Sequence, residues 1–177
     1  MKKYSLLVCL SLFAGTFALT GANLIPNGEF SKFDKLTGKA SFWNCGLYQQ
    51  VVEEGPGVTP VLRLCAYYRS RNKMWKSNTF VPVKQIAPGT YTFSFNAKGK
   101  ASMFYFFLTP GKGQKGKSFI RSFRKLQMKV LSDGWRQGQY TFTIPAEMKN
   151  ARVTIEAFFA GKGEYEFIDD VSLVKTK

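Results

Sequence analysis

The most constraining feature of the chain is the stretch of residues 91–108, YTFSFNAKGKASMFYFFL, which contains two runs with the two-residue period of β-strands. Apolar and polar residues alternate strictly in the first run, residues 91–96, as in a strand with one buried face. In the second run both faces are apolar, with Met103, Tyr105 and Phe107 on one of them. We expect a hairpin with a Lys-Gly-Lys turn at the centre of a sheet. Its second strand needs cover on both faces, or cover on one face and a ligand on the other.

Shorter runs with the same alternation recur along the chain and are separated by glycine and proline. They cover residues 41–43, 47–52, 61–67, 79–86, 135–144, 152–159 and 166–174, and residues 23–30 are predicted as a further short strand broken by Pro26. Strands of this length joined by frequent turns are typical of an antiparallel β-sandwich. The sequence therefore predicts an all-β jelly roll that forms a single domain, residues 23–177, with no internal repeat.

The amino terminus has the pattern of a secretory signal peptide. Lys2 and Lys3 precede an apolar run at residues 6–19, and small residues follow at 20–22. A single membrane anchor is the alternative, but the run is shorter than the roughly 18 to 20 apolar residues that a spanning helix needs. We expect cleavage after residue 22 and a secreted protein, either extracellular or periplasmic.

Two cysteines, Cys45 and Cys65, remain after the predicted cleavage site. In an exported chain we expect them to form a disulfide, which would close a loop of about 20 residues and stabilise the fold by roughly 3 kcal/mol in the chain-entropy model. The alternative is a pair of buried free thiols, because sequence spacing does not establish the geometry that a disulfide requires.

Positive charge dominates the chain and is unevenly distributed. Loss of Lys2 and Lys3 reduces the formal net charge from +15 to +13. No acidic residue lies between Glu54 and Asp133, a run of 78 residues that carries fifteen Lys and Arg residues. Such a field attracts polyanions. It is also compatible with a general solubility role or with adhesion to anionic surfaces.

One basic loop has the spacing of a phosphate-binding P-loop, because Gly111 is followed by Gly116, Lys117 and Ser118. A P-loop joins a strand to a helix within a parallel sheet, whereas the strands here are predicted to be antiparallel. The following residues, 119–131, are compatible with a short amphipathic helix, but no Walker B aspartate is evident. We therefore interpret the loop as flexible and basic.

Four segments in order resemble the four/nine class of carbohydrate-binding modules, which are galactose-binding-like jelly rolls. They are NLIPNGEF at residues 23–30, followed by Trp43; PGTYTFSFNAKG at 88–99; WRQGQYTFTIP at 135–145; and FIDDVSLV at 167–174. The resemblance covers nearly all of residues 23–174. It implies a carbohydrate-binding β-sandwich with no catalytic role.

The resemblance also implies a structural calcium ion, Ca²⁺, between the first and last strands. The matching positions are Glu29 and Asp169, with Asp170 adjacent. Calcium prefers carboxylate and carbonyl oxygens, so this ligand set is chemically reasonable. The alternative is that these carboxylates cap turns or pair with lysines.

Aromatic side chains in such modules stack on sugar rings, and six residues are candidates here: Trp43, Tyr48, Tyr67, Tyr68, Trp75 and Tyr105. Each could equally be a core residue. Tyr67, Trp75 and Tyr105 are the preferred platforms. Arg69 and Arg71, beside Tyr67 and Trp75, are suited to binding a carboxylate or sulfate through paired hydrogen bonds. The high positive charge departs from the family and favours an anionic polysaccharide or glycan.

Two other functions remain open at this point. The first is a basic adhesion protein that binds polyanions, including nucleic acid, without specificity. The second is a lyase for acidic polysaccharide with Tyr67 or Tyr105 as the base. The chain has no histidine, which excludes the usual catalytic triads. A glycosidase needs two carboxylates across a cleft, which the acid-free run does not supply.

Overall fold

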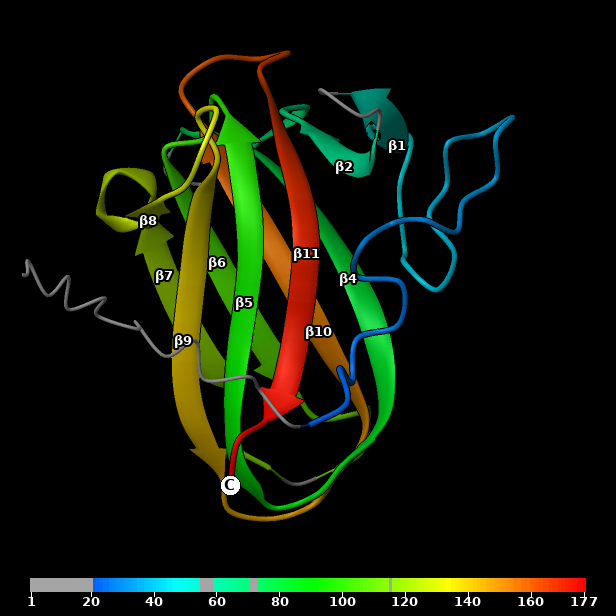
Figure 1. Cartoon of the computed structure of the whole chain (residues 1–177), viewed down its shortest axis with the longest axis vertical. Helices are drawn as coiled ribbons and strands as arrows, with labels where there is room; N and C mark the ends of the chain where they lie inside the picture. Colours follow the sequence, from blue (N-terminus) through cyan, green and yellow to red (C-terminus); the bar gives the residue numbers. More distant parts are fainter. Residues whose placement is uncertain (1–20, 55–58, 71–72, 115) are drawn as a thin grey trace, which may run out of the picture.

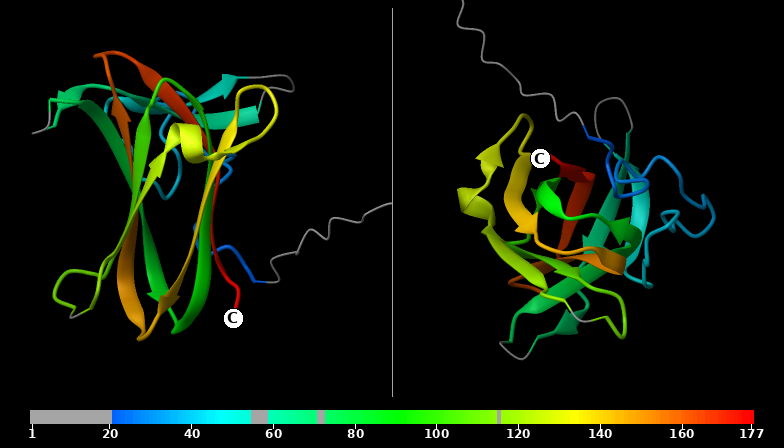
Figure 2. Two further views of the ribbon diagram at one scale, coloured as in Figure 1. Left: turned by 90° about the vertical axis from the view of Figure 1, so that its left-hand side faces the viewer. Right: turned by 90° about the horizontal axis from the view of Figure 1, so that it is seen from below.

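The computed structural model describes residues 21–54, 59–70, 73–114 and 116–177. Within these ranges the strands form two antiparallel sheets that pack face to face (Figures 1 and 2). This confirms the predicted antiparallel β-sandwich of the jelly-roll type. The six-stranded sheet contains, in spatial order, β1 (Gln49–Glu54), β2 (Thr59–Cys65), β11 (Tyr165–Lys175), β5 (Gly89–Gly99), β9 (Arg136–Ile144) and β8 (Lys129–Val130).

The five-stranded sheet contains, in spatial order, β3 (Tyr68–Arg69), β4 (Trp75–Ile86), β10 (Met148–Phe159), β6 (Met103–Thr109) and β7 (Phe119–Arg124). A single 3-10 turn, η1 (Lys125–Gln127), follows β7 and leads to β8 in the other sheet. The chain therefore crosses from the five-stranded to the six-stranded sheet at the β7–β8 connection (Figure 2).

Phenylalanine rings from both sheets fill the core. Phe93 of β5 stacks on Phe106 of β6 with ring centroids 4.0 Å apart, and Phe95 meets Phe104 edge to face at 5.2 Å. All four side chains are fully or almost fully buried. Burying each such ring contributes roughly 1.5 to 3 kcal/mol, so these contacts are a main source of stability.

The predicted central hairpin is wrong. The two runs are strands, β5 and β6, but they belong to different sheets and face each other across the core. Residues 100–102 carry the chain from one sheet to the other, and the backbone N–H of Ala101 donates to the buried carboxylate of Glu166 at 2.8 Å. The alternation of β5 is as predicted, because Tyr91, Phe93 and Phe95 are buried.

Two predicted elements near the amino terminus are also absent. Residues 23–30 and 41–43 form loops, not strands, with isolated bridges only at Asn23 and next to the second segment at Asn44. The side chain of Asn23 holds the first of these loops against β11, since its oxygen accepts the N–H of Leu173 at 2.9 Å and its amide donates to the carbonyl of Val171 at 3.1 Å. Side-chain hydrogen bonds thus replace much of a strand ladder here.

Residues 119–131 are not the short helix that their pattern permits. They form β7, η1 and β8, with Phe123 buried toward the core. The basic loop is therefore followed by a strand, and the helix that a P-loop requires is missing. In the part of the chain that the structure describes, no helix has the length and hydropathy needed to cross a membrane.

The predicted Cys45–Cys65 disulfide is not formed in this structure, where both residues are free thiols. Cys45 lies in a loop over β4, with its Sγ 3.9 Å from the hydroxyl of Thr79. Cys65 ends β2 in the opposite sheet and pairs with Tyr165 of β11. Burial raises the pKa of the Cys45 thiol. Residues 1–20, which make up almost all of the predicted signal peptide, lie outside the described ranges.

Candidate functional site

The outer face of the five-stranded sheet is unusually rich in aromatic rings, and we call it the aromatic face. Antiparallel register brings its side chains together, because Glu156 of β10 lies opposite both Tyr105 of β6 and Asn78 of β4. The alternate residues of these strands are buried in the core, which leaves the aromatic face to solvent. Its central members are Tyr68, Lys76, Asn78, Phe80, Tyr105, Phe107, Arg152, Glu156 and Phe158.

Three half-buried rings form a continuous apolar patch on this face. Tyr105 and Phe107 lie nearly parallel, with centroids 5.9 Å apart and planes inclined by 19°. Phe158 of β10 meets Tyr105 edge to face at 5.4 Å. The rings of neighbouring strands support one another, so the patch is held in place by packing.

A polar network borders the rings. Lys76 Nζ lies 3.1 Å from Glu156 Oε1 and 4.9 Å from the centroid of the Tyr68 ring. Asn78 Nδ2 donates to the Tyr68 hydroxyl at 3.0 Å and to Glu156 at 3.4 Å. Donors and acceptors therefore stand beside the apolar patch in a fixed arrangement.

Electrostatics within this network follow from burial and pairing. Burial by itself lowers the pKa of Lys76, but its hydrogen bonds to Glu156 and Tyr68 outweigh that effect, and the pKa is raised above its ordinary value. Burial also raises the pKa of the Tyr68 hydroxyl. Lys76 therefore stays cationic and Tyr68 stays neutral at physiological pH, and Tyr68 can both donate and accept hydrogen bonds.

A second cation flanks the patch. The guanidinium of Arg152 lies 4.5 Å from the centroid of the Phe80 ring, within the range of a cation–π contact. Arg152 is exposed, and its partner in register on β6 is Thr109. Arg152 and Lys76 are therefore two cations on the aromatic face whose positions are stabilised by cation–π contacts.

A tyrosine cluster extends the aromatic face at the edge strand β3. Tyr67 stacks on Tyr48 with centroids 4.2 Å apart and an interplanar angle of 12°, and it meets Tyr68 edge to face at 4.5 Å. Tyr48 is 48% exposed. Of the predicted platform residues, Tyr105 lies at the centre of the aromatic face. Tyr67 lies beside that face and contacts it by packing against Tyr68.

The remaining predicted ligand residues do not join this group. Trp75 begins β4 on the same side as the buried Ser77 and packs against the core, with Lys162 Nζ 5.8 Å from its ring centroid. Arg69 pairs with Trp75 in register, and its Nε donates to the carbonyl of Lys73 at 3.1 Å. Arg71 lies outside the described residues. Of the predicted cluster of Arg69 and Arg71 beside Tyr67 and Trp75, the structure brings Arg69 next to Trp75.

Sequence reasoning missed Phe158 and Glu156, although it identified their strand. The signal was present in RVTIEAFF, where Glu156 and Phe158 share one face and aliphatic side chains the other. The candidate Trp43, in contrast, is a core residue. Its indole is buried, and its N–H donates to the carbonyl of Asn27 at 3.1 Å.

The predicted calcium ligands lie on the opposite sheet, where β11 has a bulge between Asp169 and Ser172, and on the loop beside it, where the carbonyl of Gly28 accepts the N–H of Val171. Burial, together with the nearby charges of Asp170 and Glu29, raises the pKa of Asp169 to about 6. Asn96 Nδ2 donates to Asp170 at 2.8 Å, but its buried Oδ1 has no partner among the described residues.

In the described ranges, no three His, Cys, Asp or Glu side chains are grouped as a metal site. A calcium ion would need amide and backbone oxygens to complete its shell, and the unpartnered oxygen of Asn96 fits that need.

Comparisons with known proteins agree on the fold. No protein-family model and no curated protein matches the sequence. A solved structure of a family 61 carbohydrate-binding module in complex with β-1,4-galactotriose has a TM-score of 0.59 and 17% identity, over 87% of this chain and 99% of that one. A family 16 module has a TM-score of 0.57 and 17% identity, over 86% and 100% of the two chains.

A family 4 module, from the class that the sequence resembles, has a TM-score of 0.50 and 16% identity, over 85% of this chain and 99% of that one. Identities this low establish architecture, not ligand. The chain therefore has the jelly-roll fold of carbohydrate-binding modules.

Proposed function

We propose that the protein is a secreted, non-catalytic carbohydrate-binding domain whose ligand lies along the aromatic face. The observation that carries this proposal is the patch of Tyr105, Phe107 and Phe158 beside the hydrogen-bonding pair of Lys76 and Glu156. The apolar C–H faces of a pyranose pack well on aromatic rings, and its hydroxyls need nearby donors and acceptors. Both requirements are met on one surface.

We further propose that the preferred ligand is an anionic polysaccharide or glycan. Lys76 and Arg152 stand on the aromatic face, and Arg124 of β7 is exposed beside Met103 at the same sheet's edge. Glu156 is the one acidic residue that the described strands contribute to this face. A guanidinium or ammonium near a stacked sugar would favour a carboxylate or sulfate substituent. The net positive charge would add long-range attraction for such a polymer.

The same arrangement supports a binding role without catalysis. A glycosidase acts with two carboxylates across the scissile bond, and Glu156 has no second acid opposite it on the described strands of this face. We also propose that Glu29 and Asp169 contribute to a structural calcium site.

The proposal is tested by isothermal titration of the protein with neutral and acidic oligosaccharides at low and high salt. We expect Tyr105→Ala to weaken binding of the best ligand by at least about tenfold, since one stacked ring contributes roughly 1 to 3 kcal/mol. Thr141→Ala is the matched control, because Thr141 lies on the outer face of the opposite sheet and bonds Thr92 at 2.9 Å. It should bind as the parent does.

A second candidate, non-specific adhesion to polyanions, is favoured by the excess of positive charge. It predicts that all polyanions bind equally, that salt abolishes binding and that Tyr105→Ala changes nothing. That combination of results would replace the carbohydrate-binding proposal.

A further inference from the structure

A basic groove lies at the open edge of the sandwich, between β7 of one sheet and β9 of the other. Its polar lining includes three cations and three amides: Arg121, Arg124, Lys129, Gln127, Gln137 and Gln139. We call it the edge groove, and we propose that it binds the carboxylate or sulfate group of an acidic sugar unit. The inference rests on the proposed function, because it assigns a second subsite to the same glycan.

Unpaired positive charge is the first argument. Arg121, Arg124 and Lys129 are all exposed, and no acidic side chain lines the groove. None of the ion pairs found in the described chain involves these three residues. Cations held together without a counter-charge repel one another, and a bound anion would relieve that repulsion.

The position of Arg121 is the second argument. Its guanidinium lies 5.4 Å from the centroid of the Tyr140 ring, so it spans the gap between β7 and β9. Stacking on a ring holds a guanidinium in one orientation while its N–H groups remain free for a ligand. Arg121 is thus preorganised to present a planar donor fork to a carboxylate or sulfate.

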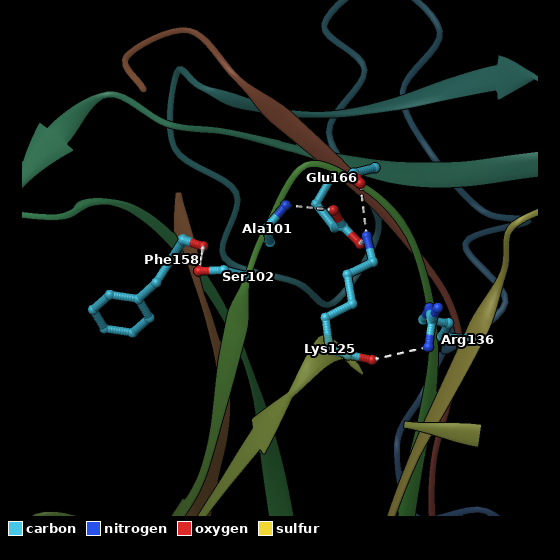
Figure 3. A network of polar contacts seen from close by, with 7 residues as sticks. Ala101, Ser102, Lys125, Arg136, Phe158 and Glu166 are labelled. Atoms are coloured by element: carbon cyan, nitrogen blue, oxygen red, sulfur yellow. Dashed lines mark hydrogen bonds and ion pairs between the residues drawn. The ribbon is translucent and has the colours of Figure 1, made fainter. Parts of the chain in front are cut away.

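The third argument is that the wall of the groove is anchored to the core (Figure 3). Lys125 Nζ lies 2.5 Å from the buried carboxylate of Glu166 and donates to the carbonyl of Gly99 at 2.8 Å. Arg136 donates to the carbonyl of Lys125 at 3.3 Å, and the N–H of Met128 donates to the same oxygen at 3.2 Å. Lys125 and Met128, on either side of Gln127 in the wall, are therefore held in place before any ligand arrives.

Size and composition favour a single acidic sugar unit over nucleic acid. The groove has a volume of about 230 Å³, below the roughly 300 to 1,000 Å³ typical of pockets that enclose larger ligands. Single-stranded nucleic acid needs several exposed rings for base stacking. Here Phe123 is buried and the Tyr140 ring is already stacked on Phe142.

The edge groove is continuous with the aromatic face. Ser122 and Arg124 line the groove, and they pair in register with Tyr105 and Met103 of β6. A chain that stacks on Tyr105 would therefore need to cross only β7 to reach Arg121. The edge groove thus adds a second place for an acidic substituent, beyond Lys76 and Arg152 on the aromatic face.

Isothermal titration with three probes tests the inference: trigalacturonate, a chondroitin sulfate tetrasaccharide and neutral β-1,4-galactotriose. We expect Arg121→Gln/Lys129→Gln to bind the better acidic probe about tenfold more weakly, as expected for losing charge-assisted hydrogen bonds, and to bind galactotriose unchanged. The matched control is Lys35→Gln/Lys39→Gln, which removes the same charge from an exposed loop on the opposite side of the molecule (Figure 1). The control should lose less than about twofold.

Equal losses in the groove variant and the control would overturn the inference, because the effect would then be net charge alone. Binding of the acidic probes that is unchanged in the groove variant would also overturn it.

The Tyr105→Ala variant separates the two proposals. If it abolishes binding while the groove variant has no effect, the proposed function stands without the edge subsite. If Tyr105→Ala is silent while the groove variant loses the acidic probe, the groove stands and the aromatic face fails. A parent protein that binds oligodeoxythymidylate but none of the sugars would overturn both.

Discussion

Lys76–Glu156 and Lys125–Glu166 are both lysine–glutamate pairs, but they lie in very different surroundings. Lys76 and Glu156 join β4 to β10 on the aromatic face, where their side chains are 21% and 16% exposed. Lys125 and Glu166 join η1 to β11 inside the end of the sandwich, where Glu166 is fully buried. Burial raises the pKa of Glu166, an effect that its contact with Lys125 partly offsets.

This difference in burial indicates that the two pairs have different roles. A buried carboxylate is costly unless each of its oxygens is satisfied, and Glu166 meets that condition through Lys125 and the N–H of Ala101. It therefore belongs to the scaffold. Glu156 and Lys76 remain within reach of solvent, so a ligand can exchange hydrogen bonds with them at little cost. Their place among exposed rings makes them part of the binding surface.

The largest effect that we predict comes from breaking the buried pair. Glu166→Leu should lower the free energy of unfolding by about 3 to 5 kcal/mol, because it leaves the largely buried ammonium of Lys125 without a counter-charge. Chemical denaturation followed by tyrosine and tryptophan fluorescence measures this change. Affinity of the folded fraction for neutral galactotriose should stay unchanged, since the aromatic face is not altered.

A double variant supplies the control for this prediction. Lys125→Met/Glu166→Leu removes both charges and should recover most of the lost stability, leaving a deficit of roughly 1 kcal/mol for the unpaired N–H of Ala101. If Glu166→Leu alone is as stable as the parent, the pair contributes nothing and the contrast between the two pairs is false.

The sequence predicted the sandwich well because strand alternation is local. Burial of Tyr91, Phe93 and Phe95 follows from their spacing alone. The hairpin prediction was wrong because alternation does not say where the next strand lies. It is the same whether that strand pairs with its neighbour in sequence or lies in the other sheet. That choice depends on contacts distant in sequence, such as Ala101 with Glu166, 65 residues apart.

The candidate site was predictable only in part, for the same reason. Tyr105 was found because both faces of its strand are apolar, which a core alone does not require. Trp75 was preferred as a platform because of its charged neighbours in sequence. The two-residue alternation of β4, however, places its side chain on the core side of the sheet. The edge groove joins β7 to β9, and no local pattern relates Arg121 to Tyr140.

A third acidic region differs from both pairs, because its carboxylates have no lysine partner within the described part of the chain. Glu29, Asp169 and Asp170 lie close enough for repulsion to raise the pKa of Asp169, after burial as the main cause. If calcium binds there, adding it at about 100-fold over its dissociation constant should stabilise the fold by roughly 2.7 kcal/mol. Thermal unfolding with and without a chelator measures this effect.

Asp169→Asn separates a calcium site from simple repulsion. The variant should lose the response to calcium, and in the presence of a chelator it should be at least as stable as the parent, because one buried negative charge has been removed. Asp133→Asn, at an exposed turn, is the matched control and should keep the response. A parent protein whose unfolding temperature ignores both calcium and chelator would refute the calcium proposal.

The smallest effect that we predict comes from the exposed pair. Glu156→Gln should change the free energy of unfolding by less than about 1 kcal/mol, since its carboxylate is a partly solvated partner and glutamine keeps an acceptor for Asn78. Binding should change more clearly. Removing the one acid from the strands of the aromatic face frees Lys76, so trigalacturonate should bind about threefold more tightly and galactotriose unchanged.

The salt dependence of this gain distinguishes its causes. If Lys76 contacts an acidic group on the glycan, the advantage of Glu156→Gln should shrink as salt rises, because the released interaction is electrostatic and partly exposed. Lys76→Gln, the complementary variant, should weaken trigalacturonate binding and leave galactotriose unaffected. An equal gain for both trisaccharides in Glu156→Gln would mean that Glu156 opposes binding by desolvation, not by charge, and that the aromatic face does not select an anionic ligand.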